Sequence, residues 1–240
     1  MSNSPIGEQT SPSPVARAVG VCRHFDTPDG RLEVLRGIDL DIPRGKMLAI
    51  VGASGVGKST FLHILGGLDM PSAGQVLWGK RSPYDLSDEE RSAYRNSAVG
   101  FVFQFHHLLP EFTAEENVAL PLIIGGDSHA DALSKAGQEL ARLGLGERLH
   151  HMPGELSGGE QQRAALARAL VTGAPLIIAD EPSGNLDRVT AEQLHAILGN
   201  IVSDGIRSII VATHNRELAG LADEVYRMRD GTLIRDGDGA

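Results

Sequence analysis

The chain has 240 residues, of which 41% are hydrophobic, and a net charge of −9 from 22 Lys and Arg against 31 Asp and Glu. The length and hydrophobic content fit one globular domain, with or without a subdomain, and the acidic balance argues against a nucleic acid partner. One cysteine (Cys22), no long apolar run and no signal-peptide pattern at the N-terminus together predict a cytoplasmic protein without disulfides or membrane spans.

The first part of the chain predicts a tail followed by a β layer. Residues 1–14 are rich in Ser and Pro and nearly devoid of apolar side chains, which indicates a flexible tail. From Val15 the pattern becomes strand-like, and residues 38–42 alternate apolar and polar side chains as a half-buried strand does. Residues 76–78 are a further strand candidate. We therefore expect a small antiparallel β layer within about the first 80 residues.

Three continuous apolar runs predict buried central strands, at residues 47–51, 176–179 and 208–213. A strand that is covered on both faces loses its alternation, which is typical of a parallel sheet in an α/β fold. Each run is followed by a helical pattern, at residues 58–65, 189–201 and 216–222. The predicted fold class is therefore α/β, with a doubly wound parallel core.

The stretch from about residue 85 to residue 156 has a more helical texture. Thr113-Ala-Glu-Glu116 is a capping box, which predicts the start of a helix. Apolar residues at helical spacing predict another helix over residues 131–143, with Gly144 at its C′ position. We interpret this stretch as a helical subdomain inserted into the α/β core.

A β-hairpin is predicted near the end of the chain. Residues 225–229 and 232–235 are short strand-like runs, and Asp230-Gly231 lies between them. An Asp-Gly pair favours the tight turn that joins two antiparallel strands.

Residues 52–59 read Gly-Ala-Ser-Gly-Val-Gly-Lys-Ser and fit the phosphate-binding pattern G-x-x-x-x-G-K-[ST]. The pattern lies between an apolar strand and a helix, a context that a chance glycine-rich turn lacks. Glycines let backbone N–H groups wrap a phosphate, and a helix N-terminus directs its positive dipole end at the same anion. Lys58 adds a full positive charge for the β and γ phosphates, and Ser59 offers a hydroxyl ligand to Mg²⁺. The predicted nucleotide contacts in this loop are Gly52, Ala53, Ser54, Gly55, Val56, Gly57, Lys58, Ser59 and Thr60.

Two acidic residues, Asp180 and Glu181, follow the apolar run at residues 176–179. Side chains at this position emerge at the carboxyl edge of a parallel sheet, where ligands of α/β proteins bind. We expect Asp180 to hold Mg²⁺, directly or through water, and Glu181 to polarise a water for attack on the γ-phosphorus. The alternative is that the two acids only cap the next turn. His214 follows the third apolar run and is expected at the same edge, where it can orient that water.

Residues 156–163, Leu-Ser-Gly-Gly-Glu-Gln-Gln-Arg, resemble the signature motif of ABC-type ATPases. Ser157, Gly158 and Gly159 form a second anion cradle, which opens a helix expected over residues 160–170. The resemblance covers residues 15–236 and implies a P-loop NTPase core with an antiparallel β layer and a helical subdomain. It also implies ATP and Mg²⁺ as cofactors and a homodimer, in which this cradle closes on the partner's nucleotide.

Other positions of the family pattern follow in order. Gln104 matches the glutamine that contacts Mg²⁺ or its water and senses the membrane partner, and Asp187 matches the aspartate that crosses the dimer seam. His214 matches the switch histidine, although Asn215 stands where an aspartate is common. Phe25 occupies the position of an aromatic residue that stacks on adenine; Tyr is usual there, and a plain core phenylalanine is the alternative.

Residues 101–117 are similar to the corresponding region of ATP-binding subunits of lipoprotein-releasing (Lol) systems. This resemblance implies a peripheral ATPase on the cytoplasmic face of the inner membrane, bound to integral membrane permease subunits, that powers release of lipoproteins toward the outer membrane. The alternatives are the ATPase of a macrolide or peptide exporter or of a cell-division-type complex, and a soluble ABC-type ATPase that transports nothing. Four apolar residues of this segment are a candidate socket for a membrane partner or, alternatively, subdomain core: Phe105, Leu108, Leu109 and Phe112.

Overall fold

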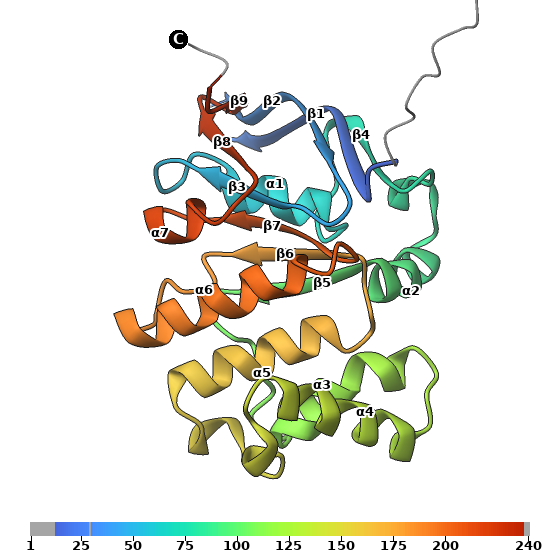
Figure 1. The fold of residues 1–240 in the computed structure, drawn as a ribbon. Coiled ribbons are helices and arrows are strands. Elements are labelled where there is room, and N and C mark those ends of the chain that lie inside the picture. The colour runs from blue at the N-terminus through green and yellow to red at the C-terminus, as the bar shows by residue number, and fades with distance from the viewer. Residues whose placement is uncertain (1–12, 29, 238–240) are drawn as a thin grey trace, which may run out of the picture.

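The structure is a computed structural model that describes residues 13–28 and 30–237. This part of the chain forms two β-sheets and a set of helices. The flexible tail predicted for residues 1–14 lies outside this part, except for its last two residues. Figure 1 shows the smaller sheet at the top, most of the larger sheet in the middle and a group of helices at the bottom. No helix among the described residues is long and apolar enough to cross a membrane.

The larger sheet has six strands in the order β5-β6-β7-β3-β8-β9. The first five run parallel, and β9 is antiparallel to β8. Every residue of β7 is buried, which explains why this strand reads as a continuous apolar run. The strands are β3 (Met47–Val51), β5 (Val99–Phe103), β6 (Leu176–Asp180), β7 (Ser208–Ala212), β8 (Glu224–Arg229) and β9 (Thr232–Arg235).

Helices cover both faces of this sheet, as the doubly wound prediction requires. On one face, Phe61 and Leu62 of α1 share an apolar cluster with Ile50. On the other face, Leu198 of α6 and Leu166 of α5 belong to a second cluster. The helices of the core are α1 (Lys58–Leu65), α2 (Asp88–Ala98), α5 (Gly158–Leu170), α6 (Arg188–Val202) and α7 (Arg216–Ala219). The last helix is shorter than predicted, because Gly220 ends it after one turn.

The stretch predicted to be helical, residues 85–156, contains a strand that the sequence did not reveal. β5 is the edge strand of the core sheet and pairs in parallel with β6. It escapes detection because it is five residues long and begins directly after α2, without a turn signal between them. The helices of the subdomain are α3 (Ala114–Ile124) and α4 (His129–Arg142), which share an apolar cluster with α5.

The predicted helix ends and the predicted hairpin are confirmed. Thr113 caps α3, with its Oγ1 accepting a hydrogen bond from the Glu116 N–H at 3.2 Å. Gly144 follows α4 with a φ of 75°, a left-handed conformation that glycine adopts without strain. Asp230 and Gly231 have φ values of 50° and 80° and join β8 to β9. Two positive φ angles are what a type I′ hairpin turn needs.

The smaller sheet is the predicted antiparallel layer, with the strand order β2-β1-β4. Its strands are β1 (Ala16–Thr27), β2 (Gly30–Ile42) and β4 (Ala73–Trp78). The indole N–H of Trp78 donates to the Leu65 carbonyl oxygen at 2.8 Å, so β4 is fastened to the end of α1. Single-turn 3₁₀ helices lie at Pro83–Asp85, Gly146–Arg148 and Pro153–Glu155.

A substitution at Gly100 tests how β5, the strand that the sequence did not reveal, packs against α5. A Cβ atom at Gly100 would lie 2.1 Å from the Ala169 carbonyl oxygen of α5, and this backbone neighbour cannot turn aside. We expect Gly100→Ala to lower the free energy of unfolding by about 1–3 kcal/mol. Gly199→Ala in α6 is the control, because a Cβ there meets nothing within 4 Å, and we expect it to stabilise the protein by about 0.5–1 kcal/mol. Equal thermal stability of the two variants contradicts this packing.

Candidate active site

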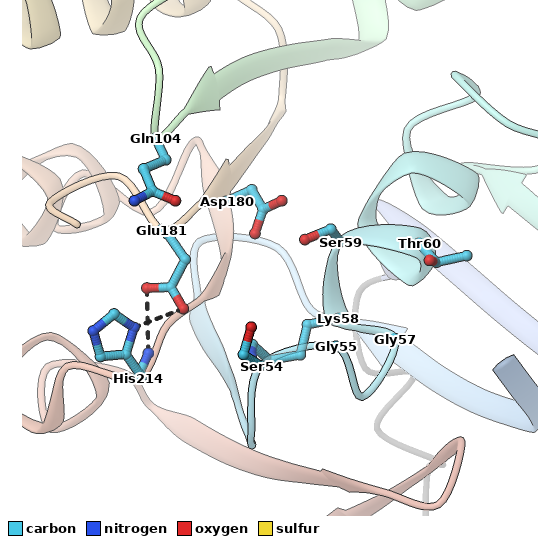
Figure 2. A pocket seen from close by; sticks show the side chains of 10 residues that line it. All are labelled: Ser54, Gly55, Gly57, Lys58, Ser59, Thr60, Gln104, Asp180, Glu181 and His214. Carbon is cyan, nitrogen blue, oxygen red and sulfur yellow. Dashed lines mark hydrogen bonds and ion pairs between the residues drawn. The ribbon is translucent and has the colours of Figure 1, made fainter. Parts of the chain in front are cut away.

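A pocket of about 550 Å³ lies at the carboxyl edge of the larger sheet. Its lining comes from the loop before α1, from the first turn of α1 and from the residues at or just after the ends of β5, β6 and β7 (Figure 2). All of the lining residues belong to the set that the sequence predicted: Ser54, Gly55, Gly57, Lys58, Ser59, Thr60, Gln104, Asp180, Glu181 and His214. Stretches that are far apart in the chain are therefore brought together in one place.

The loop before α1 can adopt its shape only with glycines. Gly57 has a φ of 111°, and a Cβ at Gly52 would lie 2.7 Å from the Met228 carbonyl oxygen. α1 begins at Lys58 and has no side-chain cap. The N–H groups of its first turn thus lack a capping oxygen and face the pocket, as in an anion site at a helix N-terminus.

The Lys58 side chain is nearly buried, with 8% of the residue exposed. Its Nζ donates to the carbonyl oxygens of Gly52 and Ala53, at 2.9 and 3.0 Å. Among the described residues, no carboxylate forms an ion pair with it. The ammonium charge is therefore held at the pocket, balanced only by neutral carbonyl dipoles, and is suited to an anion of high charge.

Asp180 and Ser59 make this pocket suitable for a hard divalent cation. The Oδ1 atom of Asp180 is buried and has no hydrogen-bond partner, which is costly for a carboxylate oxygen. In Figure 2 the Asp180 carboxylate points toward the Ser59 hydroxyl. Oxygen donors of these two kinds are the ligands that Mg²⁺ prefers, so the donor set fits that ion.

Glu181 and His214 form a pair at the mouth of the pocket. The His214 Nδ1 lies 2.9 Å from Glu181 Oε1, and the His214 backbone N–H donates to Oε2 at 3.3 Å (Figure 2). Glu181 has a φ of 46°, a left-handed conformation that is strained for a glutamate. Its backbone is held by a 2.9 Å hydrogen bond from its N–H to the Ala212 carbonyl oxygen. The carboxylate is therefore fixed in direction by β7.

Asn215, which stands where an aspartate is common in the family, caps a helix. Its Oδ1 accepts hydrogen bonds from the N–H groups of Glu217 and Leu218, at 2.8 and 3.1 Å, at the start of α7. An asparagine does this as well as an aspartate. The substitution therefore leaves the backbone next to His214 in a defined conformation.

Gln104 is fixed by a residue that the sequence did not single out. Its Nε2 donates to Asn185 Oδ1 at 2.9 Å, and Asn185 Nδ2 donates back to the Gln104 carbonyl oxygen at 3.2 Å. This double contact joins the end of β5 to the segment of residues 183–187. The only sequence signal for Asn185 is its place inside that segment.

The second cradle does not line this pocket. Ser157 caps α5, and a Cβ at Gly159 would lie 2.2 Å from Thr190 Cγ2, so the cradle packs against the start of α6. Asp187 caps α6 and accepts hydrogen bonds from the Thr190 N–H and Oγ1, at 3.1 and 2.6 Å. Both groups lie outside the pocket of their own chain.

Phe25 also lies outside this pocket. Phe25 lies on β1 and is 39% exposed, and the Arg23 guanidinium carbon lies 4.4 Å from the centre of the Phe25 ring. It is therefore not the plain core phenylalanine of the alternative interpretation, and one part of its ring remains open to solvent.

Glu160 completes the cap at the start of α5. Its Oε2 accepts hydrogen bonds from the Ser157 N–H and Oγ–H, both at 2.8 Å, and Arg148 Nε donates to Oε1 at 3.1 Å. These hydrogen bonds, led by those from Ser157, lower the pKa of Glu160 to about 2. The N-terminus of α5 thus carries an ionised carboxylate at every physiological pH.

Comparisons with known proteins place this geometry in a family. Residues 35–184 match the ABC transporter family. The chain is 45% identical over 224 residues to the lipoprotein-releasing system ATP-binding protein LolD of Geobacter metallireducens, covering 93% of this chain and 100% of that protein. It is 48% identical to the LolD protein of Alcanivorax borkumensis, covering 93% and 98%.

Solved structures that are similar to this chain support the same family assignment. The dimeric post-hydrolysis structure of the ATP-binding cassette MJ0796, bound to ADP and Pi, matches with a TM-score of 0.85 at 34% identity, covering 92% of this chain and 97% of that one. A second dimeric structure of MJ0796, described as a bacterial ABC transporter cassette, matches with the same TM-score at 35% identity.

A phosphate loop that opens a helix on a parallel sheet, with acidic residues at the end of a neighbouring strand, defines a P-loop NTPase. The α/β fold with its antiparallel layer is that of the ATP-binding cassettes, as predicted. The chain belongs to the ABC transporter family and is an ATP-hydrolysing subunit within it.

Glu160 makes the stability of this chain depend on pH in a defined way. A folded-state pKa of about 2, against an ordinary value of 4.5, means that the ionised carboxylate stabilises the fold above about pH 4.5 and that this contribution is lost as the pH falls toward 2. We expect Glu160→Gln to lower the free energy of unfolding by about 0.3–1 kcal/mol at pH 7. The difference from the natural chain should shrink below pH 4.5, as measured by denaturant unfolding. Glu147→Gln, at an exposed position, is the control, and a pH-independent difference for Glu160→Gln contradicts this role.

Proposed function

We propose that this chain powers the release of lipoproteins from the inner membrane toward the outer membrane, as a peripheral ATPase on the cytoplasmic face of the inner membrane. The support is its identity of 45–50% with LolD proteins over 85% or more of the chain. The observation that carries the ATPase chemistry is the convergence of Lys58, Asp180, Glu181 and His214 on one pocket. The ATPase domain in this proposal spans residues 15–236.

The triphosphate would be bound by residues 52–60. The first-turn N–H groups of α1 and the Lys58 ammonium would hold the β and γ phosphates. Ser59 and Asp180 would hold Mg²⁺, with Gln104 as a further contact directly or through water. When bound, this ion neutralises charge on the phosphate oxygens. Phe25 would stack on the adenine ring.

Hydrolysis would proceed by in-line attack of water on the γ-phosphorus. Glu181 accepts a proton from that water as the new O–P bond forms, and the bond from phosphorus to the bridging oxygen breaks. His214 and the backbone of β7 keep the Glu181 carboxylate directed at the water. Lys58 stabilises the charge on the leaving phosphate oxygens.

Two copies of the chain would share each nucleotide. The cradle at Ser157–Gly159 lies outside the pocket of its own chain, and the solved relatives named above are dimeric. In the proposed dimer this cradle contacts the γ-phosphate in the partner's pocket, and Asp187 lies at the seam. Binding closes the dimer because one ligand satisfies donors of both chains, and cleavage of the γ-phosphate lets it reopen.

The integral membrane permease subunits would bind the exposed apolar side chains after β5. Phe105, Leu109 and Phe112 are 66%, 42% and 37% exposed, which is unusual for neighbouring large hydrophobic residues. Leu108 instead packs against the apolar cluster of α3, α4 and α5, so for this residue the subdomain-core alternative holds.

Glu181→Gln tests the proposed base. We expect it to retain ATP binding, to lose at least about a hundredfold in hydrolysis and to accumulate an ATP-bound dimer, because only proton acceptance is removed. Lys58→Ala is the contrasting variant, since it should weaken ATP binding itself. Steady-state turnover and nucleotide affinity are the measurements. Normal turnover of Glu181→Gln removes this residue from its role.

Substitution of the exposed apolar residues tests the docking surface. The double variant Phe105→Ser, Leu109→Ser should lose its membrane partner, because the apolar area that the partner covers is removed. The measurement is the amount of permease that co-purifies with the full chain from detergent-solubilised membranes, which we expect to fall at least about tenfold. Ile206→Ser, at a residue that is 62% exposed elsewhere on the surface, is the control. Unchanged co-purification of the double variant contradicts the docking surface.

A further inference from the structure

We propose that His106 and Arg168 are positioning residues that fasten the segment after β5 to helix α5, so that this segment and the cradle at Ser157–Gly159 move as one unit. The proposal rests on the proposed function, in which that cradle binds the partner's nucleotide. It assigns to two side chains the mechanical connection between the exposed Phe105 and a phosphate-binding element.

Arg168 of α5 holds two consecutive peptide groups of the segment. Its Nη1 donates to the His107 carbonyl oxygen at 2.7 Å, and its Nη2 donates to the His106 carbonyl oxygen at 2.9 Å. No carboxylate pairs with Arg168 in the described part of the chain. The Arg168 residue is half-buried, and this burial lowers the pKa of its guanidinium. The planar guanidinium of an arginine can donate to two neighbouring acceptors at once with fixed geometry, whereas the ammonium of a lysine cannot.

His106 reaches the cradle itself. Its Nε2 lies 2.9 Å from the carbonyl oxygen of Gly158, the middle residue of the cradle. A carbonyl oxygen can only accept, so Nε2 carries the hydrogen and the tautomer is fixed. Burial, with the neighbouring His107 and Arg168, lowers the pKa of His106, and the neutral ring keeps this donor.

A third contact and a strained backbone complete the connection. Gln162, one turn further along α5, donates from Nε2 to the Phe103 carbonyl oxygen at 3.2 Å. His107 has a φ of 49°, a left-handed conformation that costs free energy for a histidine and persists only when its surroundings impose it. The hydrogen bonds from α5 are contacts that impose it.

In the sequence, Phe105 lies between a residue that lines the nucleotide pocket and a residue that contacts the cradle. Its neighbour Gln104 lines the nucleotide pocket and bonds to Asn185, while its other neighbour, His106, bonds to the cradle. A partner that presses on the exposed Phe105 therefore displaces a pocket residue and the cradle together. In the isolated chain the same contacts hold the cradle in place before the dimer closes, which reduces the entropy cost of closure.

The test uses the full chain in the Glu181→Gln background, where hydrolysis does not disperse the ATP-bound dimer. His106→Phe keeps a ring and removes the donor, and we expect the dimer dissociation constant in ATP to rise about tenfold, because both cradles of a symmetric dimer must then be ordered as it closes. The ATP affinity of the monomer should change less than about twofold, since His106 does not line the pocket. His106→Gln retains an N–H donor and should restore most of the dimer affinity. His129→Phe, at an exposed histidine on α4, is the control.

Amide hydrogen exchange supplies a second readout. We expect His106→Phe to speed exchange at residues 158–161 and to leave residues 57–60 unchanged, and Arg168→Lys to do the same more weakly while preserving charge. If His106→Phe does not fold, Arg168→Lys carries the same two measurements. Unchanged dimer affinity and exchange overturn the proposal, as does an equal loss in His106→Gln. Failure of the parent Glu181→Gln chain to dimerise in ATP instead overturns the proposed function.

Discussion

The Lys58 ammonium, held against the carbonyl oxygens of its own loop, is the interaction on which the rest of the site depends. A nearly buried ammonium that donates only to carbonyl oxygens can exchange them for an anion of high charge, which forms stronger, charge-assisted hydrogen bonds. The uncapped N-terminus of α1 adds donors to the same place. Together they make this edge of the sheet suited to binding phosphate, and Gln104, Asp180, Glu181 and His214 line the same pocket.

The acidic side of the pocket balances that positive charge. Asp180 buries an oxygen without a hydrogen bond, and Glu181 takes up a strained backbone conformation. Both features destabilise the empty fold, and both become useful when a cation and a water are present. The strand ends thus line the pocket, while apolar side chains of strands and helices together form the clusters on the two faces of the sheet.

The sequence predicts the parts of this structure that follow local rules. The loop at residues 52–59, the buried strands and the Thr113 cap depend on nearby residues alone, and each lies where the pattern places it. β5 could not be predicted, because an edge strand of five residues that directly follows a helix has no period of its own. The contact between Gln104 and Asn185 spans 81 residues, and the contact between His106 and Gly158 spans 52. Such contacts depend on how the subdomain packs, which the hydrophobic pattern does not record.

In the proposed dimer, one triphosphate is bound by the loop of one chain and the cradle of the other. The most direct test mixes two inactive chains, one with Lys58→Ala and the other with both Ser157→Arg and Glu181→Gln. The first retains an intact cradle and the second an intact loop. We therefore expect an ATP-dependent heterodimer that holds a single ATP by native mass spectrometry, while neither chain dimerises alone. Absence of that heterodimer, with ATP bound only to monomers of the second chain, contradicts the claim.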